Sequence, residues 1–249
     1  YNENKFSQVD IARMSQRAEN RHFGKPCGLM DQIACAVGGL VFIDFADPAA
    51  PVVKRTDLHL DGYRLCIIRT GGSHADLNDD YASVPAEMKA VAAYFGKSVL
   101  REVSEDELIT AVPALRKKLG DRAILRALHF MSENKRVEKA LVAAKAGDTD
   151  AFLAEINASG TSSAVALQNY FTCKAPAEQG ITLAVTLARE IMGGKGAARV
   201  HGGGFAGTAQ AFVPEEIFDK FIATMEGAFG KGAVVALEIR NESATRISD

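Results

Sequence analysis

The alternation of apolar and polar positions divides the first sixty residues into four segments. Residues 4–24 have the spacing of an amphipathic helix, and the apolar run over 30–37 predicts a second helix after a short turn. The apolar positions of the first helix are Val9, Ile11, Met14 and Ala18. Residues 38–45 and 51–60 are strand candidates because they are rich in β-branched and aromatic residues. We therefore expect helix, loop, helix and hairpin.

From residue 63 the pattern begins again with a strand. A β-rich run over 63–70 is followed by mainly helical spacing up to Met192, with a predicted stop at Gly147. We expect Pro176 to be the first residue of the last long helix, and Gly193 to end it. The apolar face of that helix comprises Ile181, Val185, Ala188 and Ile191.

The end of the chain returns to strand period. Residues 197–201 and 208–213 predict two strands, a helical face around Phe221 follows, and residues 233–239 predict a last strand. The pattern as a whole predicts an α+β protein with two domains, residues 1–62 and residues 63–249.

Composition and charge exclude several classes of protein. The 249 residues are 47% hydrophobic and 24% charged, as in an ordinary globular protein. The formal net charge of −2 argues against nucleic acid as a partner, because phosphate binding relies on clustered Lys and Arg. No run of about 18 apolar residues is present, so we expect no membrane partner.

The four cysteines are widely spaced and form no CxxC pair. This spacing disfavours a zinc ribbon, a redox dithiol or a disulfide scaffold, and it favours a reducing, cytoplasmic location. The first residue is Tyr1 and not Met, and the segment 4–24 reads as a helix already under way. We therefore expect this chain to be truncated.

The string HGGGFAG has the GxGxxG spacing at Gly202, Gly204 and Gly207. A dinucleotide fingerprint requires a helix directly after the glycines, whereas a predicted strand follows here. A tight hairpin is the simpler interpretation. The alternative is a loop whose backbone N–H groups approach phosphate oxygens closely.

Asp31 lies at or near the start of the predicted helix over 30–37. The helix dipole favours a negative charge there, as a group that orients or deprotonates a substrate hydroxyl requires. A plain N-cap is the alternative role for Asp31. Cys27 could be a nucleophile, but a buried structural thiol is the simpler interpretation.

The polar segment 71–81, GGSHADLNDDY, could hold a sugar through its many polar side chains. These are His74, Asp76, Asp79, Asp80 and Tyr81. A loop followed by an N-capped helix explains the same residues without a ligand, and the sequence leaves both readings open.

Three segments together resemble the galactokinases of the GHMP small-molecule kinase superfamily. They are RAENRHFGKPCGLMDQ over 17–32, the segment 71–81, and GAARVHGGGFAGTAQAFV over 196–213. The resemblance implies a two-lobe GHMP kinase-like fold, with a remnant of the N-terminal lobe and a complete ferredoxin-like C-terminal α+β lobe. It also implies ATP and Mg²⁺, with galactose or a related monosaccharide as substrate.

The resemblance also implies roles for individual residues. Asp31, the aspartate of CGLMDQ, would act on the anomeric hydroxyl that accepts the phosphoryl group, and Glu19 would help to hold Mg²⁺. Gly28 and Tyr81 would lie against the sugar. The glycines beside the phosphate path would be Gly202, Gly203 and Gly204. Asp31 and these glycines would then share one cleft between the lobes.

The sequence also departs from the family pattern. The first family motif and the Gly/Ser-rich nucleotide loop would lie upstream of Tyr1, and His201 and Ala206 differ from the usual third motif. We therefore expect an ATP-dependent sugar 1-kinase of which this chain alone has little or no activity. A non-catalytic sugar-binding regulator on the same scaffold is the alternative, and a purely structural lobe is a third interpretation.

Overall fold

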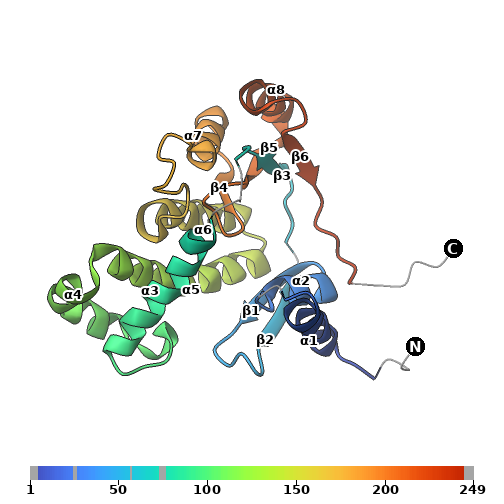
Figure 1. Cartoon of the computed structure of the whole chain (residues 1–249). Helices are drawn as coiled ribbons and strands as arrows, with labels where there is room; N and C mark the ends of the chain where they lie inside the picture. Colours follow the sequence, from blue (N-terminus) through green and yellow to red (C-terminus); the bar gives the residue numbers. More distant parts are fainter. Residues whose placement is uncertain (1–4, 25–26, 57, 73–76, 244–249) are drawn as a thin grey trace. The chain divides into compact units, whose positions relative to one another are not determined.

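The computed structural model of the chain consists of two compact units (Figure 1). It describes residues 5–24, 27–56, 58–72 and 77–243. The first unit extends to His59 and includes the segment from Glu238 onward, and the second comprises Leu60–Leu237. The predicted second domain, 63–249, differs from the second unit at its end. The reason is that the Gly39 N–H donates to the Arg240 carbonyl at 2.9 Å, which joins the last segment to the first unit.

The first unit contains two helices and a two-stranded antiparallel sheet, in the predicted order. Its elements are α1 (Gln8–Arg17), a π-helical turn (Ala18–His22), α2 (Met30–Val37), β1 (Leu40–Asp44) and β2 (Val52–Thr56). A capping box starts α1, since the Ser7 hydroxyl accepts from the Asp10 N–H while the Asp10 carboxylate accepts from the Ser7 N–H.

The buried face of α1 differs from the apolar positions that the sequence indicates. Ile11 and Met14 are 44% and 47% exposed, whereas Ala12 is 1% exposed. Ala12 belongs to the core of this unit together with Ile33 and Val37 of α2. The small side chain of Ala12 lets the two helices approach closely, so the larger apolar residues of α1 face away from this contact.

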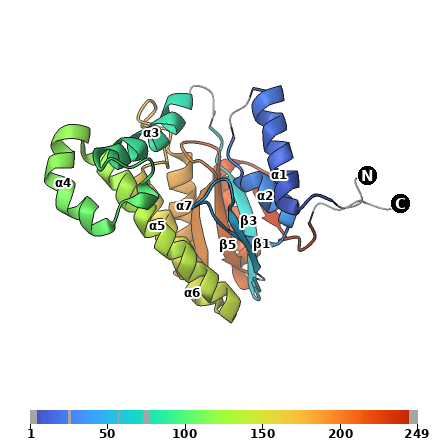
Figure 2. The same ribbon diagram turned by 90° about the horizontal axis from the view of Figure 1, so that it is seen from below.

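The second unit is built on a four-stranded antiparallel sheet. Its strands are β3 (Tyr63–Arg69), β4 (Ala197–His201), β5 (Thr208–Pro214) and β6 (Val234–Leu237), in the order β4-β5-β3-β6. Helix α7 (Gly180–Met192) lies along the sheet beside β5 (Figure 2), and α8 (Phe218–Phe229) precedes β6. Together with the helices between β3 and β4, this is the β-α-β-β-α-β order of a ferredoxin-like fold, so the predicted fold is confirmed.

Alternate residues of the strands form the core of the sheet. Cys66 and Ile68 of β3 lie in it with Ala209 and Ala211 of β5, because successive side chains of a strand point to opposite faces. The helices contribute the predicted apolar faces, including Ile181, Val185, Ala188, Phe221 and Met225.

A second core lies among α3 (Asn78–Tyr94), α4 (Glu105–Leu119) and α5 (Asp121–Ala146), three of the helices between β3 and β4. Helix α6 (Thr149–Ser162) follows them before α7, and short turns at Leu100–Glu102, Ser163–Leu167 and Glu215–Ile217 complete the unit. Val91, Leu108 and Ala127 are fully buried in this cluster. Within the described residues, no helix is long and apolar enough to cross a membrane.

Two predicted helix ends are confirmed and one start is wrong. Gly147 and Gly193 follow α5 and α7 with φ of +69° and +58°, the left-handed conformation that glycine adopts most readily. Pro176 is not the first residue of α7, which begins at Gly180. A Cβ at Gly180 would lie 2.9 Å from the carbonyl oxygen of Thr70, the residue after β3, so the start of this helix packs closely against that residue.

Candidate functional site

Asp31 lies in the first turn of α2, and its side chain is exposed. The N-cap residue is Leu29, and no side chain caps the helix. The interpretation of Asp31 as a plain N-cap is therefore wrong. Its carboxylate instead lies at the positive end of the helix dipole, where it is available to a ligand.

The loop that leads into α2 is held by side-chain amides. The Cys27 N–H donates to Asn20 Oδ1 at 2.8 Å, and Gln16 Nε2 donates to the Cys27 carbonyl at 3.1 Å. Gln32 Nε2 lies 3.4 Å from Cys27 Sγ and donates to Glu19 Oε1, also at 3.4 Å. These bonds connect the π-helical turn, the loop and α2.

Glu19, in the π-helical turn, is thereby hydrogen-bonded to Gln32, the residue that follows Asp31 in α2. No group of three or more His, Cys, Asp or Glu that could hold a metal occurs within the described part of the chain. Mg²⁺ usually takes one or two carboxylates together with substrate phosphates and water. The half-buried carboxylate of Glu19 fits that donor set.

Gly28 lies in open space. Its φ is outside the left-handed region, and a Cβ built on it meets no atom of the described residues within 4 Å. Neither the backbone conformation nor protein packing requires glycine at this position. The missing side chain therefore leaves room beside the start of α2.

All four cysteines are free thiols, in different surroundings. The polar partners of Cys27 within the described residues are the amides named above, which is in keeping with a structural role. Cys66 is fully buried in β3, and burial raises the pKa of its thiol to about 12. Cys66 is therefore protonated at neutral pH.

In the second unit, the glycine cluster forms the hairpin loop between β4 and β5, as predicted. A Cβ at Gly203 would lie 2.8 Å from Tyr81 Cε1, and one at Gly204 would lie 2.1 Å from the Asn169 carbonyl oxygen. At Gly202 a Cβ would meet nothing within 4 Å, although its φ is +71°. Two of the three glycines are therefore required by neighbouring protein segments.

Tyr81, on α3, packs directly on this hairpin. Its hydroxyl donates to the Gly204 carbonyl at 3.0 Å, and its ring makes an edge-to-face contact with Phe205 at 5.4 Å between centroids. Burial and, secondarily, the Asp80 carboxylate raise the pKa of Tyr81. The structure thus brings together Tyr81 and the glycines, which sequence reasoning had singled out separately.

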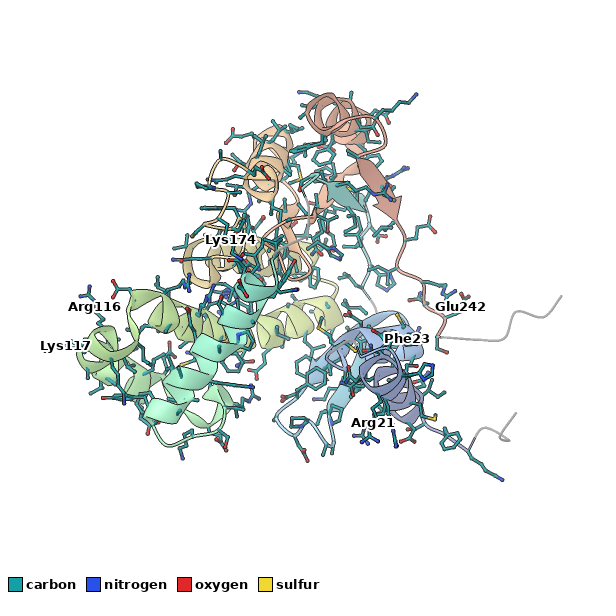
Figure 3. The ribbon with its side chains drawn as sticks, viewed as in Figure 1. Arg21, Phe23, Arg116, Lys117, Lys174 and Glu242 are labelled. Carbon is teal, nitrogen blue, oxygen red and sulfur yellow. The ribbon has the colours of Figure 1, made fainter. Side chains whose placement is uncertain are left out.

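Two aspartates of segment 71–81, Asp79 and Asp80, lie in the first turn of α3 and have partners within the second unit. Lys174, which is labelled in Figure 3, donates from Nζ to Asp79 Oδ2 at 3.1 Å, and the Thr172 hydroxyl donates to Asp80 Oδ2 at 2.9 Å. The N-cap of α3 is Leu77, which makes no side-chain cap, so the capped-helix interpretation is wrong at this residue. His74 and Asp76 lie outside the described residues.

A pocket of about 230 Å³ lies beside the hairpin, within the second unit. It is lined by Thr70, Gly71, Gly72, Leu77, Thr172, Glu178, Gly180, Ile181, Phe205 and Ala206. The pocket joins the end of β3, the start of α7 and the hairpin. Ala206, one of the departures from the family pattern, faces Gly72, where a built Cβ would lie 3.4 Å from its methyl group. His201, the other departure, lies with Nδ1 3.1 Å from Thr208 Oγ1 at the base of the hairpin.

Asn169, which no sequence pattern singles out, also holds the hairpin. This residue is 3% exposed, and its carbonyl accepts from the Phe205 N–H at 2.6 Å. Its side-chain Nδ2 donates to the Gly203 carbonyl at 3.1 Å. Asn169 follows a helical region with no glycine or proline beside it, so its local sequence carries no signal for this role.

Comparison with known proteins identifies relatives of this chain. Residues 1–39 match the GHMP kinases N terminal domain family. The galactokinase of Glaesserella parasuis is 33% identical over 210 residues, which cover 84% of this chain and 52% of that protein. The galactokinase of Streptomyces coelicolor is 32% identical over 231 residues, covering 91% and 56%. The chain thus spans about half the length of these curated relatives.

Solved structures show the same fold. The Lactococcus lactis galactokinase complexed with galactose matches with a TM-score of 0.77 and 22% identity, covering 98% of this chain and 62% of that one. The mevalonate kinase of L. major matches with a TM-score of 0.58 and 14% identity, covering 96% and 60%. By sequence and by fold, the chain is therefore a relative of the galactokinases within the GHMP kinase superfamily.

Proposed function

We propose that the protein carrying this chain is an ATP-dependent sugar kinase. It transfers the γ-phosphoryl group to the anomeric hydroxyl of galactose or a closely related monosaccharide. The observation that carries this proposal is the exposed Asp31 carboxylate in the first turn of α2, beside the open space at Gly28. The sequence relationship to galactokinases supports the choice of sugar.

Asp31 is the proposed catalytic residue. It orients the sugar hydroxyl and accepts its proton as the new bond to phosphorus forms. Phosphoryl transfer passes through a loose transition state, so most of the catalysis comes from alignment and from stabilisation of charge. A carboxylate at the end of a helix serves alignment well, because the helix backbone fixes its position.

Glu19 is the proposed protein ligand of Mg²⁺. When bound with ATP, the ion supplies neutralisation of the phosphate charge. Gln32 holds the Glu19 carboxylate toward α2 through the bond at 3.4 Å. Through this hydrogen bond the Glu19 side chain links the π-helical turn to α2, the helix that bears Asp31.

The remaining proposed contacts come from glycines and one tyrosine. Gly28 and Tyr81 approach the sugar, and the backbone N–H groups of Gly202, Gly203 and Gly204 stabilise the transferred phosphoryl group. Support comes from the open side of Gly202, where a Cβ would meet no atom, and from the hydrogen bond that fixes Tyr81 on the hairpin. The free thiols are compatible with the cytoplasmic location that we propose.

The test is galactose-dependent ADP release by the intact protein and by its Asp31→Asn variant. Loss of the general base should lower kcat by roughly a thousandfold. Asp219→Asn is the matched control, because Asp219 is likewise exposed in the first turn of a helix, α8, whose N-cap also lacks a side-chain bond. This control should keep wild-type turnover.

Two results would contradict the proposal. If Asp31→Asn turns over galactose at the wild-type rate, the catalytic assignment is wrong. If calorimetry shows tight sugar binding by the wild-type protein while no ADP is released, the protein is a sugar-binding regulator and not a kinase.

A further inference from the structure

Asn169 connects the helical part of the second unit to the glycine hairpin through both its backbone and its side chain. Its carbonyl accepts from the Phe205 N–H at 2.6 Å, and its Nδ2 donates to the Gly203 carbonyl at 3.1 Å. Gly204 lies so close that an added Cβ would be 2.1 Å from the Asn169 carbonyl oxygen. One buried residue therefore contacts three successive residues of the loop.

The turn that precedes Asn169 is itself held by hydrogen bonds to neighbouring segments. Gln168 has a φ of +59°, unusual for a residue other than glycine, and its N–H donates to the Ser163 carbonyl at 2.8 Å. Arg126, 1% exposed, donates from Nε to the Leu167 carbonyl at 3.1 Å and from Nη1 to Glu87 at 2.9 Å. A partly buried ion pair with Glu87 thus fixes Arg126, which holds the turn that precedes Asn169.

These bonds determine how the peptide groups of the loop are turned. In a trans peptide the C=O and the N–H point in opposite directions. The peptide between Gly203 and Gly204 is trans, and its carbonyl is held by the Asn169 amide. The Gly204 N–H must therefore point away from Asn169.

The next peptide is held from both sides. The Gly204 carbonyl accepts from the Tyr81 hydroxyl at 3.0 Å, while the Phe205 N–H donates to the Asn169 carbonyl. Phe205 has a φ of +61°, which costs a non-glycine residue roughly 1 kcal/mol. Such a conformation persists only where the surrounding contacts determine it, and here Asn169 and Tyr81 supply those contacts.

We propose that Asn169 is a positioning residue that sets the orientation of the Gly203–Gly204 peptide, so that the Gly204 N–H donates to an oxygen of the transferred phosphoryl group. This inference rests on the proposed kinase function. Asn169 does not touch the substrate. It acts by keeping one backbone donor aligned before the reaction, which is how a fixed dipole stabilises a transition state without reorganising.

Two substitutions in the intact protein test the proposal. Asn169→Ala removes the side-chain donor, and Asn169→Asp keeps the shape while presenting only acceptor oxygens to the Gly203 carbonyl when ionised. Both retain the backbone bond to Phe205. Asn169→Asp is nearly isosteric with the wild type and serves if the alanine variant fails to fold.

Two readouts are needed. Hydrogen exchange measured by mass spectrometry on the peptide that covers 202–207 should become roughly tenfold faster in both variants. kcat for galactose-dependent ADP release should fall roughly a hundredfold, with a much smaller change in KM for the sugar, because alignment in the transition state is lost.

Asn157→Ala is the matched control. Asn157 also clamps β4, with Nδ2 donating to the Gly196 carbonyl at 2.9 Å and Oδ1 accepting from the Ala198 N–H at 3.1 Å, but at the end of the strand away from the hairpin. This variant should lose stability while hairpin exchange and kcat stay near the wild-type values. An equal loss of kcat in Asn157→Ala would overturn the positioning role.

The outcomes separate this inference from the proposed function. If the wild-type protein phosphorylates galactose and the Asn169 variants keep wild-type exchange and kcat, the inference is wrong and the function stands. If the wild-type protein releases no ADP with sugar, the proposed function fails and the catalytic role of Asn169 fails with it, whatever the exchange of the hairpin.

Discussion

The two glycine-bearing loops of this protein use glycine for opposite reasons. At Gly28, before α2, an added Cβ would meet no atom, whereas at Gly204 it would lie 2.1 Å from a backbone oxygen. The hairpin glycines at 203 and 204 are therefore required by the fold itself. Gly28 is required by no neighbour within the described structure, and the proposed sugar contact would give it a role.

The side chains that hold the two loops also differ, because those at the hairpin are more deeply buried. Half-buried Gln16 and exposed Asn20 hold the backbone at Cys27. The hairpin is held by Asn169, which is 3% exposed, and by the partly buried Tyr81. Because buried hydrogen bonds open less readily, we expect the hairpin to be the more rigid loop.

The largest expected effect on stability comes from Gly204→Ala. The methyl group would collide with the Asn169 carbonyl, and the φ of +84° is unfavourable for alanine. We expect a loss of about 3 kcal/mol in the free energy of unfolding. Urea denaturation followed by circular dichroism measures it. Gly202→Ala is the control, since its φ is similar but its Cβ would be free, and it should lose only about 1 kcal/mol.

The second largest effect that we expect is a loss of stability at alkaline pH, caused by the buried Cys66 thiol of β3. Burial raises the pKa of Cys66 to about 12 from 9.0. Above pH 9 the unfolded chain releases this proton while the folded chain keeps it, so stability falls as pH rises. The loss between pH 9 and pH 11 should be about 2 kcal/mol.

The comparison of wild type with Cys66→Ala isolates this contribution. The variant should show a smaller decrease over the same pH range when unfolding is measured at each pH, although it starts from a lower stability because of the cavity it leaves. Parallel curves for the two proteins would show that Cys66 is not the group responsible.

A smaller effect is expected for Tyr81→Phe. This change removes only the hydroxyl that donates to the Gly204 carbonyl and keeps the ring contact with Phe205. The loss of one hydrogen bond should cost about 1 kcal/mol of unfolding free energy. Hydrogen exchange of residues 202–207 should rise in the same variant. Unchanged exchange would mean that Tyr81 does not fix the loop.

The smallest effect on stability should come from Gly28→Ala. Because its φ is not left-handed and its surroundings are open, alanine should leave the free energy of unfolding unchanged or raise it by up to about 1 kcal/mol. Under the proposed function the same variant binds galactose more weakly, as calorimetry would measure. A clear loss of stability would contradict the contrast between the two loops.

Local sequence determined the elements and most of their ends. The segments 63–70 and 197–201 became strands, and Gly147 and Gly193 ended helices as expected, because period and left-handed glycine are properties of a few neighbouring residues. Helix α7 shows the limit of this reasoning, since close packing of Gly180 against Thr70 overrides the proline signal at Pro176.

The candidate functional residues also divide into those that local sequence predicts and those that only tertiary contacts identify. The sequence alone placed Asp31 at a helix start and the triple glycine in a hairpin. Only the tertiary structure showed that Tyr81 contacts that hairpin and that Asn169 holds it. It also showed that α1 buries Ala12 and leaves Ile11 exposed. These facts depend on contacts between segments 34 or more residues apart, or on which face of a helix meets its neighbour, and no local pattern of apolar and polar positions encodes such contacts.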